Sequence, residues 1–189
     1  MYLFQVAQPS KFTEIEAHEF IRLLSAELIK KEYKVISGFG LGVGSSVIIG
    51  ALQEIYMHKR SMNEDKLLLR PFPQGIEDEN TRQKLWQQYR EDMISRAGVS
   101  IFIFGNKLDN GTTVIANGVK SEYEIARKFH NLIVPIGCTG YAAQEIWNEV
   151  NANMSDFYTN VDVTLNDAFN KLNIKCDPSD MINNIISFI

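Results

Sequence analysis

Short apolar runs alternate along the chain with longer stretches in which apolar residues recur every three or four positions. The short runs are rich in β-branched residues and too brief for helices, which indicates buried strands. These predicted strands cover residues 2–6, 34–37, 66–72, 99–104 and 132–136. The longer stretches have the spacing of amphipathic helices, and the predicted helices cover residues 13–29, 47–57, 81–97, 121–130, 141–150, 165–172 and 179–189.

The alternation of strand and helix predicts the fold class. Strands that are each followed by a helix form a parallel sheet with both faces covered. We therefore expect an α/β, Rossmann-like, doubly wound parallel sheet with helices on both faces. The 189 residues suffice for one such domain, so residues 1–189 are expected to form a single domain. Because the core begins almost at the first residue, we expect the chain to be the C-terminal part of a longer protein, with a complete protein as the alternative.

Composition and charge narrow the classes of partner. The net charge is −4 and there is no long basic run, which argues against nucleic acid. No run of about 18 apolar residues is present to cross a bilayer, and the N-terminus lacks a signal-peptide pattern. Cys138 and Cys176 form no CxxC or Cys/His cluster, so neither a disulfide framework nor a zinc site is indicated. We expect a cytoplasmic protein without metal or cofactor.

A glycine-rich loop follows the strand at residues 34–37. Glycines occupy every second position from Gly38 to Gly44, where bare backbone amides and a helix N-terminus can approach an anion. Gly40, Gly42 and Ser45 are therefore candidate phosphate ligands. The match to GxGxxG is imperfect, because Ser45 stands where the third glycine belongs. The alternative is that these glycines only allow a tight turn and close packing of helix on sheet.

Two arginines are candidate partners for an anion. Arg70 ends an apolar strand and precedes a proline, so its guanidinium should emerge at the carboxyl edge of the sheet, where open α/β folds bind ligands. It also stands where the NAD fingerprint has an acid, which disfavours NAD redox chemistry. Arg90 flanks the apolar stripe of its helix and needs an anion or a path to water. The alternatives are a surface salt bridge for Arg70 and a snorkelling side chain for Arg90.

The strand at residues 99–104 leads directly into polar residues. Gly105, Asn106 and Lys107 follow it at the carboxyl edge of the sheet, and an amide and an ammonium there can hold a phosphate.

The helix expected at residues 121–130 begins with a further candidate group. Gly118 and Ser121 precede or start this helix, and the carboxylate of Glu122 can accept hydrogen bonds from ribose hydroxyls. Alternatively, Ser121 with Glu124 forms a capping box, and Glu122 merely stabilises the first turn of the helix. We expect Arg90 and Glu122 to hold opposite ends of one ligand. No catalytic residue is assigned, because no nucleophile elbow, P-loop lysine or HExxH motif is present.

These segments together resemble the SLOG superfamily, and most closely its Sir2- and TIR-associating type from Thoeris anti-phage defence. The resemblance covers nearly the whole chain and is carried by ISGFGLGVGS, LLLRPFP, YREDMISRAGVSIFIFGNK, GVKSEYEIA and IVPIGCTG. It implies a sensor domain preceded in the full-length protein by a sirtuin-like NAD hydrolase. In that family a cyclic ADP-ribose isomer made by a TIR-domain protein binds the SLOG site and activates the hydrolase.

The resemblance also supplies an alternative function. Enzymes of the LOG branch hydrolyse nucleoside 5′-monophosphates to free base and carry PGGxGTxxE. Residues 117–124 read NGVKSEYE, in which the Gly-Thr pair has become Lys120-Ser121 while Glu124 keeps the glutamate. With fewer bare amides beside a substrate, preorganised catalysis weakens while binding can survive. A third possibility is an architectural module. SLOG relatives commonly pair through helices, so we expect at least a homodimer, with the helices around Trp86 and Trp147 as candidates for the interface.

Overall fold

The structure is a computed structural model, which describes residues 11–39, 44–58 and 66–189. The predicted strand at residues 2–6 and the candidate ligands Gly40 and Gly42 lie outside this part. The helices are α1 (Glu14–Lys30), α2 (Gly44–Met57), α3 (Glu79–Ile94), α4 (Asn117–Lys128), α5 (Tyr141–Ala152), α6 (Met154–Phe157), α7 (Val163–Lys171) and α8 (Pro178–Phe188). The strands are β1 (Val35–Ser37), β2 (Leu67–Leu69), β3 (Val99–Phe102), β4 (Asn106–Asp109), β5 (Thr112–Ile115) and β6 (Leu132–Pro135).

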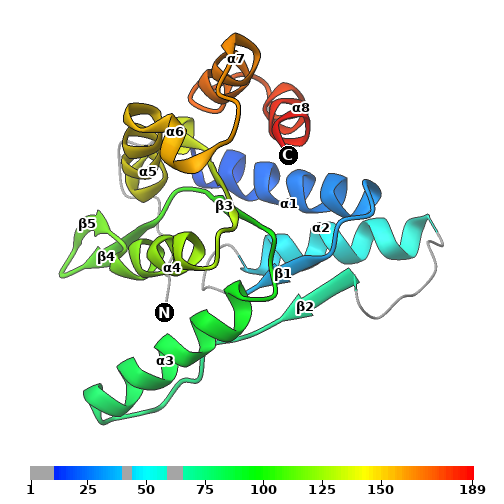
Figure 1. The fold of residues 1–189 in the computed structure, drawn as a ribbon. Coiled ribbons are helices and arrows are strands. Elements are labelled where there is room, and N and C mark those ends of the chain that lie inside the picture. Colours follow the sequence, from blue (N-terminus) through cyan, green and yellow to red (C-terminus); the bar gives the residue numbers. More distant parts are fainter. Residues whose placement is uncertain (1–10, 40–43, 59–65) are drawn as a thin grey trace.

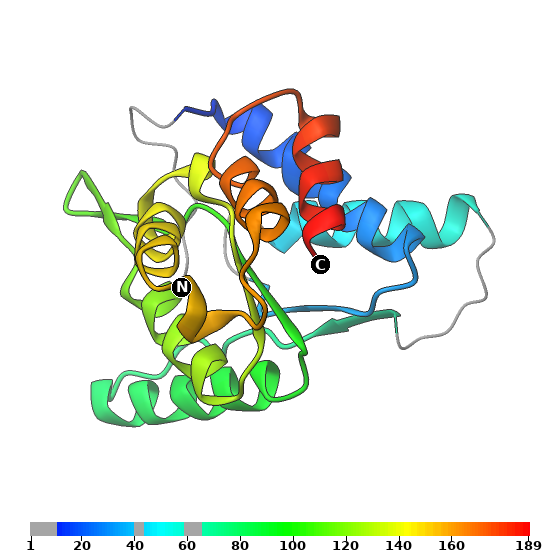
Figure 2. The ribbon, with the colours of Figure 1, turned by 45° about the horizontal axis from the view of Figure 1, so that its top comes forward.

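The predicted α/β, Rossmann-like fold is confirmed. β1 pairs with β2 and β3 pairs with β6, both in parallel. A helix follows β1, β2 and β6, whereas two further strands separate β3 from α4. Helices α1 and α2 lie on one side of β1 and β2, and α3 lies on the other side (Figures 1 and 2). The chain therefore winds helices onto both faces of its parallel strands, as the alternation of elements requires.

The core lies where the helices pack onto these strands. Phe20, Val134 and Phe169 are fully buried, and α8 contacts both α1 and α7. The ring of Trp147 stacks on Phe169 at a centroid distance of 5.4 Å and an interplanar angle of 11°. The Trp147 side chain therefore packs against the core. This contact argues against a dimer interface through the helix that carries Trp147. In the part of the chain that the structure describes, no helix is both long and apolar enough to cross a membrane.

Helix starts follow local capping. Helix α1 starts with a capping box, because Thr13 and Glu16 exchange hydrogen bonds between side chain and backbone. The capping box predicted for Ser121 with Glu124 is wrong. Helix α4 already begins at Asn117, directly after β5, and the Ser121 hydroxyl donates to the Asn117 carbonyl within the helix. Glu122 accordingly lies in the second turn and not in the first.

Sequence analysis missed an antiparallel hairpin between β3 and α4. Strands β4 and β5 pair from Asn106 with Ile115 to Asp109 with Thr112. The turn residues Asn110 and Gly111 both have positive φ, at 48° and 79°. Such angles are those of a type I′ turn, whose twist matches the flanking strands. The residues that follow β3 are therefore held in a regular element.

Candidate functional site

A hollow of about 780 Å³ lies between α3, β4 and the start of α4. Four of the predicted site residues line it, namely Arg90, Lys107, Gly118 and Ser121. We refer to it below as the basic hollow. The remaining residues that line it are Glu79, Arg82, Gln83, Lys84, Trp86, Gln87, Gln88, Ala116 and Asn117.

A sharp corner at the carboxyl end of β3 directs the chain into this hollow. Phe104 and Gly105 have φ of 54° and 90°, and a side chain at Gly105 would place its Cβ 2.6 Å from the Cβ of Ala142. Position 105 therefore requires glycine both for its backbone angle and for space. The turn is held by the Gly105 carbonyl, which accepts from the Ala116 amide at 2.8 Å. This corner starts β4 with the buried Asn106 and brings Lys107 to the wall of the basic hollow.

The N-terminus of α4 opens into the same hollow. Its N-cap, Ala116, provides no side-chain hydrogen bond to the helix. The first backbone amides of a helix need partners, and together with the helix dipole they favour an anion. Asn117 and Gly118 of this first turn line the hollow. The site thus combines a helix N-terminus with cationic side chains, an arrangement suited to phosphate or carboxylate.

The charge of the lining is predominantly positive. Arg82, Lys84, Arg90 and Lys107 line the basic hollow, against the single carboxylate of Glu79. Glu79 is bonded within its own helix by Arg82. A concave surface with excess charge of one sign concentrates ligands of the opposite sign. The hollow therefore favours an anionic ligand although the chain as a whole is acidic.

Arg90 and Glu122 form an ion pair at one side of the hollow. The Nε of Arg90 lies 3.7 Å from the Oε1 of Glu122, and the side chains are only 10% and 20% exposed. The guanidinium carbon of Arg90 is also 5.2 Å from the ring centroid of Phe72 and 6.0 Å from that of Trp86. Arg90 is buried and paired, which excludes the snorkelling alternative.

The prediction assigned Arg90 and Glu122 to opposite ends of one ligand, and the structure brings the two side chains together. Helices α3 and α4 pack together, so residues that are 32 positions apart in the sequence face each other. Glu122 therefore already has a cationic neighbour, and any ligand contact that it makes is coupled to Arg90.

A second cavity, of about 340 Å³, lies on the other side of Glu122. It is lined mainly by apolar side chains of α1, β1, α3 and β3, and Gly105, Asn106 and Glu122 are also part of its lining. We call it the apolar cavity. The predicted site residues thus divide between two spaces, and Arg90 with Glu122 links them.

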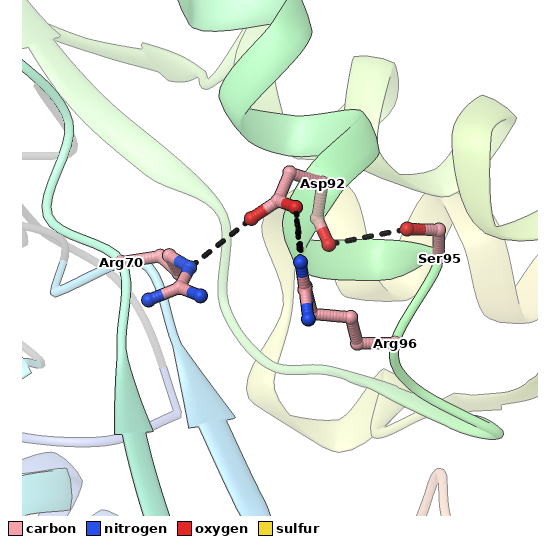
Figure 3. Close-up of polar contacts among 4 residues, drawn as sticks. All are labelled: Arg70, Asp92, Ser95 and Arg96. Atoms are coloured by element: carbon pink, nitrogen blue, oxygen red, sulfur yellow. Dashed lines mark hydrogen bonds and ion pairs between the residues drawn. The ribbon is translucent and has the colours of Figure 1, made fainter.

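Arg70 does not reach either space. Its Nε donates to the Oδ2 of Asp92 at 3.1 Å, and Asp92 also accepts from Arg96 (Figure 3). Hydrogen bonds from Arg96 and then from Arg70 hold the pKa of Asp92 below its usual range. With its side chain 34% exposed, Arg70 is the salt-bridged surface arginine that sequence analysis gave as the alternative to a phosphate ligand.

The described part of the glycine loop supports close packing. A Cβ at Gly38 would lie 2.8 Å from the Phe72 ring, and one at Gly44 would lie 2.7 Å from the Phe39 ring. At these two positions glycine is required for space, which agrees with the alternative that the glycines allow close packing of helix on sheet. Ser45 is exposed in the first turn of α2 and lines neither the basic hollow nor the apolar cavity.

The glutamate of the hydrolase alternative points away from the site. The Glu124 side chain is 67% exposed, lies 3.9 Å from Arg127 and lines neither space. Lys120, which stands where LOG enzymes have glycine, forms an ion pair with Glu145 at 2.7 Å. A general acid or base must lie within hydrogen-bond reach of the reacting atoms, and Glu124 does not lie there.

Sequence analysis missed Arg82, Lys84 and Asn117 as lining residues, and it gave the helix around Trp86 as a candidate for a dimer interface. A signal was present, since Arg82, Trp86 and Arg90 are spaced by four residues and so share one face of α3. The Arg82 guanidinium carbon lies 5.5 Å from the Trp86 ring centroid. This row forms the α3 wall of the basic hollow.

Comparison with known proteins places these features in a family. The model of STALD, the Sir2- and TIR-associating SLOG family, matches residues 5–189. A protein of Bacillus cereus (strain MSX-D12) named NAD(+) hydrolase ThsA is 47% identical over 174 residues, which are 92% of this chain and 36% of that protein. ThsA proteins of Cytobacillus dafuensis and Acinetobacter baumannii (strain 532279) are 44% and 35% identical over 76% and 84% of the chain. The chain thus spans about a third of the length of these relatives.

Proposed function

Because the chain belongs to the Sir2- and TIR-associating SLOG family, we propose that it is a sensor domain for a cyclic ADP-ribose isomer made by a TIR-domain protein. Binding of this nucleotide activates a sirtuin-like NAD hydrolase domain linked to the sensor, as part of anti-phage defence. The names of the relatives, NAD(+) hydrolase ThsA, support the link to NAD hydrolysis, and the extra length of those proteins supports the presence of a further domain.

The observation that carries the proposal is the basic hollow beside the Arg90–Glu122 pair. A cyclic ADP-ribose isomer has a diphosphate, two riboses and an adenine. Lys107, Arg90 and the N-terminus of α4 offer charge and amide donors to the diphosphate. The carboxylate of Glu122 accepts hydrogen bonds from ribose hydroxyls. The volume of about 780 Å³ lies within the range of small-molecule sites, which is about 300–1,000 Å³.

The same geometry favours sensing over hydrolysis. Glu124, which would act at the glycosidic bond in a phosphoribohydrolase, is exposed beside Arg127. A glycine of the LOG motif is replaced by Lys120, and the Lys120 ammonium forms an ion pair with Glu145. Binding without a group positioned at the reacting bond leaves the ligand intact.

A thermal-shift series tests the proposal. A ligand that binds only the folded chain stabilises it by about 2.7 kcal/mol at a concentration of 100 times Kd, or about 5–10 °C for a domain of this size. We expect at least one cyclic ADP-ribose isomer to raise the unfolding midpoint by this amount, and AMP to raise it less. If AMP gives the larger shift and is converted to adenine, the phosphoribohydrolase is correct instead.

A further inference from the structure

A single tryptophan interrupts the polar lining of the basic hollow. Among the described residues that line it, Trp86 is the only aromatic one. It shares one face of α3 with Arg82 and Arg90, which lie one helical turn before and one turn after it. The charged side chains and the helix N-terminus suit an anion without the help of a ring, so the indole adds a different kind of surface to the site.

The indole is fixed by contacts outside the hollow. Its N–H donates to the Pro73 carbonyl at 3.0 Å, and the Phe72 ring meets it nearly perpendicularly, with centroids 6.0 Å apart and an interplanar angle of 78°. Because the N–H already has its partner, the indole offers the hollow its apolar ring surface. A fixed aromatic plane of this kind is suited to stacking with another flat ring.

The two arginines beside the indole are held in different ways. The guanidinium carbons of Arg82 and Arg90 lie 5.5 and 6.0 Å from the ring centroid of Trp86. Arg90 is buried and paired with Glu122 of another helix, whereas the Arg82 side chain is 34% exposed and paired with Glu79 of its own helix. Exposed ion pairs and exposed cation–π contacts are weak, and a base stacked on an aromatic ring is held more strongly. Arg82 can therefore leave the ring when a base arrives.

The indole also lies within reach of the anion donors. Arg90 follows it by one turn, which is about 5.4 Å along α3, and Lys107 lines the same hollow. A phosphate held by these cations can therefore be joined through one ribose to a base on the indole. Gln83 and Gln87 line the hollow beside Trp86, and glutamine amides can pair with the edge of adenine.

We propose that Trp86 is the base-binding residue of the basic hollow, on which an adenine stacks and displaces Arg82 from the ring. The inference rests on the proposed function, because it requires the phosphates of a nucleotide at Arg90 and Lys107. It adds a source of selectivity to that function. Inorganic phosphates can occupy the cationic groups, but a ligand must also carry a flat base to cover the indole. The hollow thereby distinguishes a nucleotide from an anion of similar charge.

Tryptophan fluorescence reports on the base directly. The chain has two tryptophans, and Trp147 is stacked on Phe169 in the core, so in Trp147→Phe the tryptophan emission comes from Trp86. Cyclic ADP-ribose isomers that bind should quench this emission with the Kd that titration calorimetry gives, whereas pyrophosphate at equal concentration should not. Heat of binding without quenching, or equal quenching by pyrophosphate, would overturn the proposal.

Two substitutions separate stacking from support of the wall. Trp86→Leu keeps apolar bulk but has no ring, and it should weaken binding of a cyclic ADP-ribose isomer about tenfold. Trp86→Phe keeps a ring on which a base can stack and should retain most of the affinity. Equal affinities of the two variants, whether both high or both low, would show that stacking at position 86 does not hold the base.

The same titrations distinguish a failure of this inference from a failure of the proposed function. If no isomer gives a heat of binding with the unmodified chain, both are wrong. If an isomer binds the unmodified chain and Trp86→Leu equally well, the proposed function stands, and Trp86 serves only to hold Pro73 and Phe72 against α3.

Discussion

The Arg90–Glu122 pair sits between a polar and an apolar space, and its energetics follow from that position. Two charges removed from water lose hydration that their mutual attraction only partly restores. Removing one partner leaves the other buried and uncompensated, which costs more than the pair contributes. A nucleotide that brings phosphate to the guanidinium and hydroxyls to the carboxylate would satisfy both groups further.

Substitution of the pair tests this coupling. Arg90→Ala and Glu122→Ala should each weaken nucleotide binding at least tenfold, since a lost charged hydrogen bond costs about 1.5–3 kcal/mol. Because the side chains face each other, the double variant should lose less affinity than the sum of the single losses. Titration calorimetry on the four proteins measures this difference.

Arg96→Ala serves as the matched control for that cycle. Arg96 lies on the surface beyond α3 and bonds Asp92, away from both spaces. Its removal should leave affinity unchanged. Strictly additive losses for Arg90 and Glu122 would show that the two residues act on the ligand separately, contrary to the geometry.

The buried thiol of Cys138 predicts a dependence of stability on pH. Burial raises the pKa of Cys138 from 9.0 to about 11, so the folded state keeps a proton that the unfolded state loses. The stabilisation is complete below pH 9 and disappears as pH rises to 11. Its size follows from 1.36 kcal/mol for each pH unit, or about 2.7 kcal/mol. Burial raises the pKa of Tyr123 and Tyr158 as well, which acts in the same direction.

Urea unfolding at pH 8, 9, 10 and 11 measures this effect. The free energy of unfolding should fall steadily above pH 9. The fall should be smaller in Cys138→Ala, which has no thiol to titrate. An equal fall in both proteins would assign the whole effect to other groups.

At the scale of elements, the packing of α1 on α2 depends on one glycine. A Cβ at Gly50 would lie 2.0 Å from the carbonyl oxygen of Arg22, which is backbone and cannot rotate away. Gly50→Ala must push the helices apart, and overpacking of this kind costs about 1–3 kcal/mol. Gly98→Ala is the control, because a Cβ there meets nothing within 4 Å. Thermal unfolding should show a clear loss for the first variant and none for the second; equal midpoints would contradict the close approach of α1 and α2.

Helices and strands with regularly spaced apolar residues could be predicted from the sequence, whereas the polar strands β4 and β5 could not. Helix α1 was predicted over residues 13–29, because the spacing of its apolar residues is a local signal. The hairpin of β4 and β5 was missed although Asn110-Gly111 is a typical hairpin signal. Its strands are polar and partly exposed and so lack an alternating pattern.

In the candidate site, some residues could likewise be predicted from the sequence, whereas contacts between helices could not. Lys107 and Gly118 were predicted as ligand-binding residues because they follow elements whose ends meet at the carboxyl edge of the sheet, and both line the basic hollow. The contact of Arg90 with Glu122 could not be predicted, since it depends on how α3 packs on α4. Arg70 was misplaced because sequence shows where a strand ends but not that Asp92 of α3 lies beside it.

For the whole molecule, α2 presents a row of exposed apolar side chains. Ile49, Leu52 and Tyr56 are 54%, 37% and 62% exposed and lie three and four residues apart on one face. Apolar patches of this kind are typical of interaction surfaces. We expect the chain to form at least a dimer through α2, and light scattering at micromolar concentration should give no less than twice the chain mass. Leu52→Glu should shift the mass toward the monomer, whereas a monomeric mass of the unmodified chain would contradict the expectation.

The central claim is that the basic hollow binds a cyclic ADP-ribose isomer and leaves it intact. Titration calorimetry of the unmodified chain with each isomer, followed by chromatography of the same sample, tests both parts together. We predict saturable binding of at least one isomer at one site per chain, with the nucleotide recovered unchanged. Absence of binding by every isomer, or release of free adenine from the bound nucleotide, would contradict the account.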